Sequence, residues 1–207
     1  GIYVHTSGID TLVKKYTSEL YKTDRHYRYF YHFYDRLEDS APYEALRDLV
    51  ERVYTNDFLN PLLVDYAEAL SSVSGDAGIT KQYNFYNAKV KYAKDRVAVI
   101  ISDAMRYEVG VSLFERLQAD EKCTASLSVM QSMLPSVTRL GMAALLPHRK
   151  LTIVDADNAL VDELPTIDLK QREAILQKEK PDSRAVQYDE IKGMSQEELR
   201  GIFARQD

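Results

Sequence analysis

The first 75 residues show the spacing of apolar positions that is typical of amphipathic helices. Aromatic side chains recur three and four residues apart within RHYRYFYHFYDR. The same spacing follows Pro42, where the apolar positions are Leu46, Leu49, Val50, Val53 and Tyr54. Pro42 itself suits the first turn of that helix, because the N–H that proline lacks would have no partner there. The pattern predicts an α-helical region over residues 1–75.

Two breaks are expected in and after this region. Pro61 is expected to separate NDFLN from a further helix in LLVDYAEAL. The stretch SSVSGDAG consists mainly of turn and linker residues. A last helix is expected after it, so residues 76–94 are interpreted as a linker and a connecting helix.

From residue 95 the pattern changes to alternating strands and helices. RVAVIIS is a β-branched apolar run typical of a strand buried on both faces. KCTASLSVM alternates apolar and polar residues, and two further strands are expected in KLTIVDA and RAVQYDE. Helices are expected in YEVGVSLFERLQAD, SVTRLGMAALL, DLKQREAILQKE and SQEELRGIF, the last opening with Ser195 and Glu198 at capping-box spacing. This order predicts an α/β domain over residues 95–207, with a parallel-type sheet and crossover helices.

Composition narrows the class of protein. The 207 residues are 45% hydrophobic with a net charge of −5, so no overall basic field attracts nucleic acid or anionic lipid. No apolar run is long enough to cross a bilayer, and the opening GIYVHTSGID lacks the features of a secretory signal. The single cysteine, Cys123, is consistent with the reducing cytoplasm and is expected in a buried strand rather than as a catalytic thiol.

The aromatic run within the helical region has two interpretations. Tyrosine and phenylalanine side chains interleave with Arg25, Arg28 and Arg36, which is compatible with stacking on nucleic-acid bases. Packing between helices is favoured instead, because the chain has fifteen tyrosines and no overall basic charge. A local basic groove that binds DNA stays open as the alternative.

Asp103 stands directly after the strongest strand pattern, in VAVIISDAMRYE. Ligands of open α/β sheets gather at the carboxyl ends of the strands. A buried carboxylate is costly without a partner, and a divalent metal would offset that cost. The alternative is a helix cap, in which Ser102 or Asp103 accepts N–H bonds from the helix that follows.

Thr138 gives a second candidate, in QSMLPSVTRLGMAALLPH. Pro135 restricts Leu134 to an extended conformation, so Thr138 falls at or near a helix N-terminus, where an anion is favoured. A simple capping role is the alternative for this residue alone. Together with Asp103, it suggests a hydroxyl nucleophile activated by a metal that a carboxylate holds.

SDAMRYE followed by LPSVTRLGMAALLPH resembles the PglZ proteins of bacterial BREX phage-defence systems, which belong to the alkaline phosphatase superfamily. The resemblance extends through DRHYRYFYHFYD, LVERVYTNDFLNPLLVDYAEAL and RAVQYDEIKGMSQEELRGIF. It implies an alkaline phosphatase-like fold, two divalent metals (commonly zinc) and hydrolysis of a phosphoester. Asp103 matches an aspartate metal ligand. Thr138, in the pattern P-x-x-T, matches the nucleophile that also ligates metal.

The resemblance leaves several roles open. Arg106, one helical turn past Asp103, is a candidate contact to a phosphoryl oxygen, although a role at the sheet edge or in solvent is the alternative. No histidine follows His148, which is expected to offset a helix dipole rather than bind metal. The remaining metal ligands are therefore expected outside this chain, which we interpret as an inactive piece of a longer enzyme.

Two functions are compatible with these expectations. The first is a metal-dependent phosphatase or phosphodiesterase that acts on a phosphoester or nucleotide, with direct DNA binding open. The second is a non-catalytic interaction module that docks onto other BREX proteins.

Overall fold

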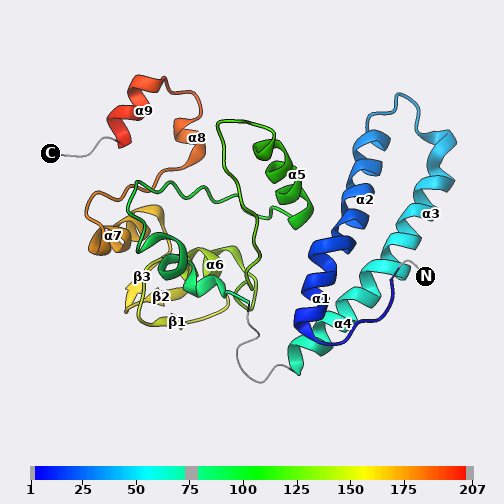
Figure 1. Cartoon of the computed structure of the whole chain (residues 1–207), viewed down its shortest axis with the longest axis horizontal. Helices are drawn as coiled ribbons and strands as arrows, with labels where there is room; N and C mark the ends of the chain where they lie inside the picture. The colour runs from blue at the N-terminus through cyan, green and yellow to red at the C-terminus, as the bar shows by residue number, and fades with distance from the viewer. Residues whose placement is uncertain (1–2, 73–78, 204–207) are drawn as a thin grey trace. The chain divides into compact units, whose positions relative to one another are not determined.

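The computed structural model of the chain describes residues 3–72 and 79–203, which fold as two compact units (Figure 1). Unit 1 comprises Gly1–Ile79 and Ser102–Ser128. Unit 2 comprises Thr80–Ile101 and Val129–Asp207. Most of the predicted linker SSVSGDAG falls on residues 73–78, which lie outside the described residues.

Unit 1 is built on two helical arms that lie side by side as a hairpin (Figure 1). The first arm consists of α1 (Ile9–Lys15), a π-helical turn (Tyr16–Leu20) and α2 (Tyr21–Tyr34). The second arm consists of a 3₁₀ turn (Ala41–Tyr43), α3 (Glu44–Tyr54), a π-helical turn (Thr55–Leu59) and α4 (Asn60–Ser71). A further helix, α5 (Tyr107–Gln118), packs on α2.

The two prolines of the second arm lie at helix starts. Pro42 lies in the first turn before α3, as predicted. Pro61 lies in the first turn of α4, a position in which proline is tolerated. It stands between the π-helical turn and α4, as predicted, although the helical path continues from one to the other.

Aromatic and aliphatic side chains hold the arms together. Leu12, Leu20, Phe58 and Leu62 form the buried core between them. Above it, the rings of Tyr27 and Tyr54 stack with centroids 3.7 Å apart. This confirms the predicted packing role of the aromatic run. The face after Pro42 is less buried than its spacing predicts, since Leu46 and Leu49 are about half exposed.

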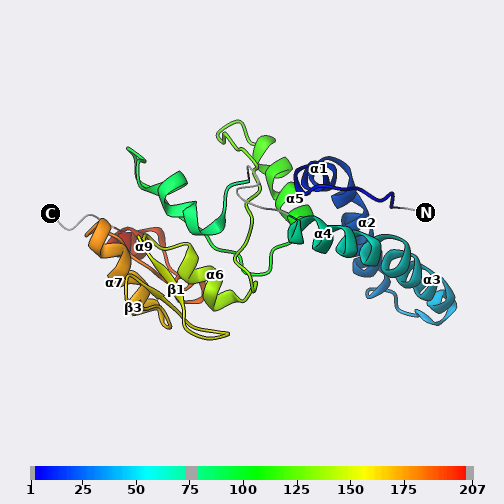
Figure 2. The ribbon, with the colours of Figure 1, turned by 90° about the horizontal axis from the view of Figure 1, so that it is seen from below.

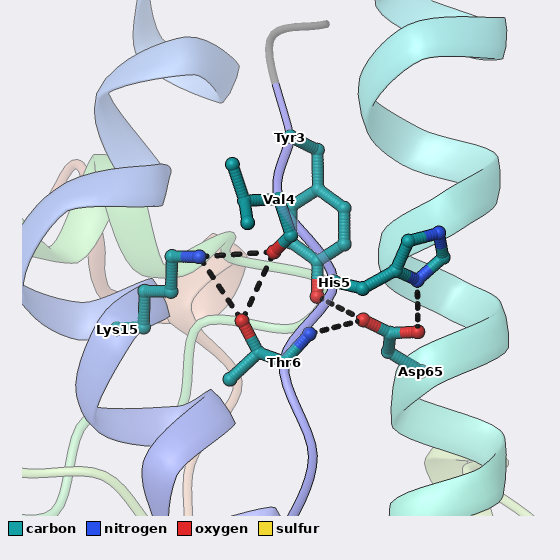
Figure 3. Close-up of polar contacts among 6 residues, drawn as sticks. All are labelled: Tyr3, Val4, His5, Thr6, Lys15 and Asp65. Atoms are coloured by element: carbon teal, nitrogen blue, oxygen red, sulfur yellow. Dashed lines mark hydrogen bonds and ion pairs between the residues drawn. The ribbon is translucent and has the colours of Figure 1, made fainter.

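Asp65 of α4 fastens the segment before α1 to the hairpin (Figure 3). Its carboxylate accepts a hydrogen bond from the Tyr3 hydroxyl at 2.6 Å and one from the Thr6 N–H at 2.7 Å, and it pairs with His5 Nδ1 at 2.8 Å. Lys15 of α1 holds the other side, donating to the Thr6 hydroxyl at 3.0 Å. The bonds from Tyr3, His5 and Thr6, in that order of effect, lower the pKa of Asp65 to about 2.

Unit 2 contains a small sheet covered by helices (Figure 2). The strands β1 (Leu151–Ile153), β2 (Ala159–Val161) and β3 (Leu164–Pro165) pair antiparallel in the order β1-β2-β3. The helices are α6 (Thr138–Ala144), α7 (Leu169–Glu179), α8 (Tyr188–Ile191) and α9 (Gln196–Phe203). The core lies where α6 and α7 meet the sheet, at Leu140, Ala143, Val161 and Ile175.

Several helix predictions for the second half are confirmed. The expected helices appear as α5, α6, α7 and α9. Ser195 and Glu198 make the predicted capping box, with the Ser195 N–H 2.7 Å from a Glu198 carboxylate oxygen. The connecting helix appears only as two short turns, Gln82–Asn84 and Tyr86–Val90.

The predicted parallel sheet with crossover helices is not confirmed. Within the described residues the strands pair antiparallel, and the one parallel contact is the isolated bridge between Lys81 and Gln131. Only KLTIVDA forms a strand where one was expected. RVAVIIS and KCTASLSVM form no ladder with a neighbouring strand, and RAVQYDE runs into α8. A strand exists only where a neighbour accepts and donates its backbone hydrogen bonds, and the sequence pattern of one segment does not supply that neighbour.

Gln82 ties three segments of unit 2 together. Its backbone N–H donates to the Gln131 carbonyl at 2.8 Å, and its side-chain Oε1 accepts from the Met133 N–H at 3.0 Å. Its Nε2 donates to the Gly141 carbonyl of α6 at 3.3 Å. A Cβ on Gly141 would lie 3.1 Å from that Nε2, so glycine leaves room for the amide. Gln82 thereby fixes both ends of the segment that contains Thr138.

We predict that Asp65→Asn lowers the free energy of unfolding at neutral pH, because an amide cannot accept all three hydrogen bonds as a carboxylate does. The pKa of Asp65 is depressed in the folded state, so its contribution is complete above its unfolded value of about 4 and is lost as the pH falls through about 2. Denaturant unfolding of both proteins at pH 6 and near pH 2.5 should therefore show a difference that shrinks with acid. A pH-independent difference would contradict the role of this carboxylate.

A second prediction concerns the Gln82 amide. Alanine at position 141 should gain about 1 kcal/mol of helix propensity and lose about as much by displacing one hydrogen bond. We therefore expect Gly141→Ala to be nearly neutral alone and to stabilise by about 1 kcal/mol in a Gln82→Ala background. Gly201→Ala in α9 is the control, because nothing lies within 4 Å of its Cβ position. Equal effects of Gly141→Ala in both backgrounds would rule out the coupling.

Candidate active site

Asp103 lies in a short exposed segment between the extended run 97–101 and α5. Its Oδ1 accepts a hydrogen bond from the N–H of Ala104 at 3.0 Å. Ala104 adopts φ 54°, a left-handed conformation that costs a residue with a Cβ on the order of 1 kcal/mol. α5 begins at Tyr107 and its N-cap residue is Arg106. Neither Ser102 nor Asp103 is therefore the cap of α5, and the capping alternative is wrong.

Arg106 is exposed and has an extended backbone before the first turn of α5. Burial and the hydrogen bond to Asp24 raise the pKa of Tyr54, and the positive charge of Arg106 opposes that rise. Arg106 is therefore a solvent-exposed cation near Tyr54 of unit 1.

The two residues after Arg106 anchor the segment, which sequence reasoning missed. The Tyr107 ring contacts the rings of Tyr16 and Tyr21, with centroids 5.9 and 5.7 Å away. Glu108 is completely buried, and both of its carboxylate oxygens accept bonds from Arg28, at 2.7 and 2.8 Å. The signal in the sequence was a glutamate in the first turn of a helix whose neighbouring positions are apolar, together with an arginine among aromatic residues.

Thr138 is the first residue of α6 and is exposed. The N-cap position belongs to Val137, so Thr138 is at the predicted helix start but is not the cap residue. The opposite face of α6 is fixed, since Leu140, Ala143 and Ala144 are fully buried. Gln82 holds the chain on either side. The hydroxyl is thus presented on a rigid support, and Gln82 is a second residue that the sequence pattern did not single out.

Asp103 belongs to unit 1 and Thr138 to unit 2, so each candidate is described within its own unit. Within residues 3–72 and 79–203, no group of three or more histidine, cysteine, aspartate or glutamate side chains could hold a metal. A carboxylate and a hydroxyl are suitable oxygen donors for a divalent metal, but two donors form only part of a ligand set. Asp103 and Thr138 therefore have the donor chemistry that a divalent metal accepts, while a set of three such side chains is not found among these described residues.

The remaining candidates have structural roles. His148 Nδ1 lies 2.7 Å from the Leu146 carbonyl, close after the end of α6. Cys123 is half-buried in an extended segment that forms no ladder, so the predicted buried strand is not formed. Among the helices that the structure describes, none is both long and apolar enough to span a bilayer.

Comparisons with known proteins identify relatives of this chain. It is 36% identical to the alkaline phosphatase-like protein PglZ of Bacillus cereus (strain H3081.97), over 93% of the chain and 23% of that protein. It is 32% identical to the alkaline phosphatase-like protein BrxZ of Escherichia coli O9:H4 (strain HS), over 96% of the chain and 24% of that protein. The chain thus spans about a quarter of the length of these relatives. No solved structure matches it.

A family match agrees with these relatives and with the motifs around Asp103 and Thr138. Residues 85–207 match the family described as the BREX system PglZ alkaline phosphatase-like domain. That range contains Asp103, Arg106 and Thr138. The chain belongs to the PglZ family of the BREX system.

Proposed function

We propose that this chain contributes a threonine nucleophile and one metal ligand to a metal-dependent phosphohydrolase of a BREX anti-phage defence system. The observation that supports this most strongly is the place of Thr138, an exposed residue at the start of a helix on which Leu140, Ala143 and Ala144 are completely buried. A nucleophile needs a fixed position relative to its substrate, and a helix anchored by a buried face provides one. The membership in an alkaline phosphatase-like family supports the same role.

In the proposed reaction the Thr138 oxygen forms a bond to phosphorus while the bond to the leaving oxygen breaks. A metal, zinc in our proposal, would lower the pKa of the hydroxyl and stabilise charge on the oxygens of the phosphoryl group. Asp103 would hold that metal through its carboxylate, and Thr138 would be a second ligand. Arg106 would pair with a phosphoryl oxygen. Water then releases the phosphoryl group from threonine.

We further propose that the remaining ligands come from the part of the protein outside this chain.

The apolar run before Asp103 is exposed to solvent. Its residues Val97, Val99, Ile100 and Ile101 are exposed, with Ile100 91% exposed. Such a β-branched run is costly to leave in water. It would be buried as a strand of a parallel sheet whose other strands lie elsewhere in the protein, and this would place Asp103 at the strand end.

The proposed substrate is a phosphoester or nucleotide in the cytoplasm, and the proposed partners are other BREX proteins. Direct binding to DNA belongs to the same proposal, on surfaces that include more than this acidic chain. The second candidate function is a non-catalytic interaction module. It is favoured by the exposed apolar side chains of the hairpin, among them Phe33, Leu46 and Leu49.

Activity of the full-length protein tests the nucleophile. With zinc and a chromogenic phosphodiester, Thr138→Ala should reduce turnover by at least about a hundredfold, because losing a nucleophile removes the main reaction path. Thr138→Ser keeps the hydroxyl and should retain measurable turnover. Equal activity of wild type and Thr138→Ala would refute Thr138 as the nucleophile. If wild type, Thr138→Ala and Thr138→Ser are all inactive both with and without zinc, the interaction module is favoured. The 207-residue chain alone should be inactive.

Metal binding tests Asp103 separately. Competition with a chelator should show that Asp103→Asn in the full-length protein weakens zinc binding by about tenfold or more, because the amide is a neutral and poorer ligand. Asp157→Asn is the matched control, since Asp157 is an exposed aspartate in the β1–β2 connection. The same zinc affinity in wild type, Asp103→Asn and Asp157→Asn would exclude Asp103 as a ligand.

A further inference from the structure

We infer that Arg28 of α2 is a positioning residue for Asp103, which it controls through Glu108 and α5. The inference rests on the proposed function for its consequence, because Asp103 is proposed there as a metal ligand. The contacts that support it all lie within unit 1.

An ion pair between Arg28 and the buried Glu108 joins α2 to α5. Glu108 has no exposed surface, and the Arg28 Nε and Nη2 atoms donate to its two oxygens at 2.7 and 2.8 Å. A buried carboxylate is tolerated only with well-formed hydrogen bonds, and the planar guanidinium satisfies both oxygens in one orientation. The pair therefore sets the position of the first turn of α5 on α2 in a directional way that apolar contacts would not.

The second step is the aromatic contact beside the pair. Tyr107 lies against Tyr16 and Tyr21 and its hydroxyl is 3.5 Å from the Thr17 carbonyl. Tyr107 and Glu108 are consecutive, so the first helical turn of α5 is fixed at two neighbouring points. Both points lie on the first arm of the hairpin.

The third step is the distance along the chain to Asp103. Asp103 precedes Tyr107 by four residues, so even a fully extended chain keeps its Cα within about 14 Å of the anchored residue. The segment is not fully extended, because Ala104 turns the chain in the left-handed conformation. The position of α5 on α2 therefore limits the region in which the Asp103 carboxylate can lie.

The same two helices provide a matched control. Arg25 of α2 contacts Glu115 of α5 through a single carboxylate oxygen, at 3.2 and 3.3 Å. The Glu115 side chain is 53% exposed and the Arg25 side chain 18%, so solvent screens the pair from the Glu115 side. It also lies two turns further from Asp103. Removing it should leave the Asp103 segment unchanged.

Hydrogen exchange in the absence of metal tests whether Arg28 fixes the segment that contains Asp103. In the full-length protein, Arg28→Met should accelerate exchange of the amides of residues 102–106 by roughly two- to thirtyfold, the usual range for coupling through packed elements. Arg28→Lys should fall between Arg28→Met and wild type, and Arg25→Met should match wild type. Unchanged exchange in Arg28→Met would overturn the inference, whatever the protein's activity.

The zinc dependence of activity then tests whether Arg28 affects metal binding through Asp103. Arg28→Met should raise the zinc concentration for half-maximal activity by roughly two- to thirtyfold and leave kcat at saturating zinc largely unchanged. The double variant Arg28→Met with Glu108→Leu removes the unpaired charge and should restore folding, yet it should keep weakened zinc binding because the directional contact is lost. Wild-type zinc dependence in the double variant would mean that the pair only stabilises the fold and would overturn the inference.

The two hypotheses fail in different ways. If Asp103→Asn leaves zinc binding unchanged, the proposed metal ligand is wrong, while the exchange result for Arg28 still stands or falls independently. If Asp103→Asn weakens zinc binding and Arg28→Met changes neither exchange nor zinc dependence, the proposed function stands and the positioning role of Arg28 is overturned.

Discussion

The burial of Glu108 is the constraint on which the position of α5 in unit 1 depends. A carboxylate with no exposed surface requires a partner in a defined geometry, and Arg28 supplies it from a helix 80 residues earlier in the chain. The ion pair and the Tyr107 contacts join α5 to the helical hairpin. As a result, the Asp103 segment is attached to the N-terminal helices, and the hairpin is part of the framework of the candidate site rather than a separate appendage.

Thr138 depends on a different kind of support. The small residues of α6 let the helix lie close to the sheet, and Leu140, Ala143 and Ala144 are completely buried there. Gln82 adds directional hydrogen bonds on both sides of the segment. Unit 1 therefore holds a carboxylate and unit 2 a hydroxyl, each on its own support. The chain itself spans about a quarter of the length of its relatives.

Local patterns in the sequence predicted the helices well and the sheet poorly. The helical face of the aromatic run, the starts of α5 and α6 and the capping box of Ser195 and Glu198 follow from interactions within a few residues. The segment around Ile100 has the composition of a buried strand, but it is exposed because no neighbouring strand lies within the described residues. Asp103 and Thr138 were singled out because the first follows a predicted strand, which is not formed, and the second a predicted helix start, which is. Their supports, Arg28, Glu108 and Gln82, depend on contacts between distant residues, which a single sequence does not reveal.

The central claim is that Thr138 attacks phosphorus, and trapping the intermediate tests it most directly. The full-length protein would be mixed with zinc and a phosphodiester, quenched rapidly and digested, and the peptide containing Pro135 and Thr138 analysed by mass spectrometry. The account predicts that this peptide gains the substrate's phosphoryl group on Thr138 in wild type and gains nothing in Thr138→Ala. Two results together would contradict it. The substrate would be turned over without modification of this peptide at any quench time, and Thr138→Ala would show unchanged turnover.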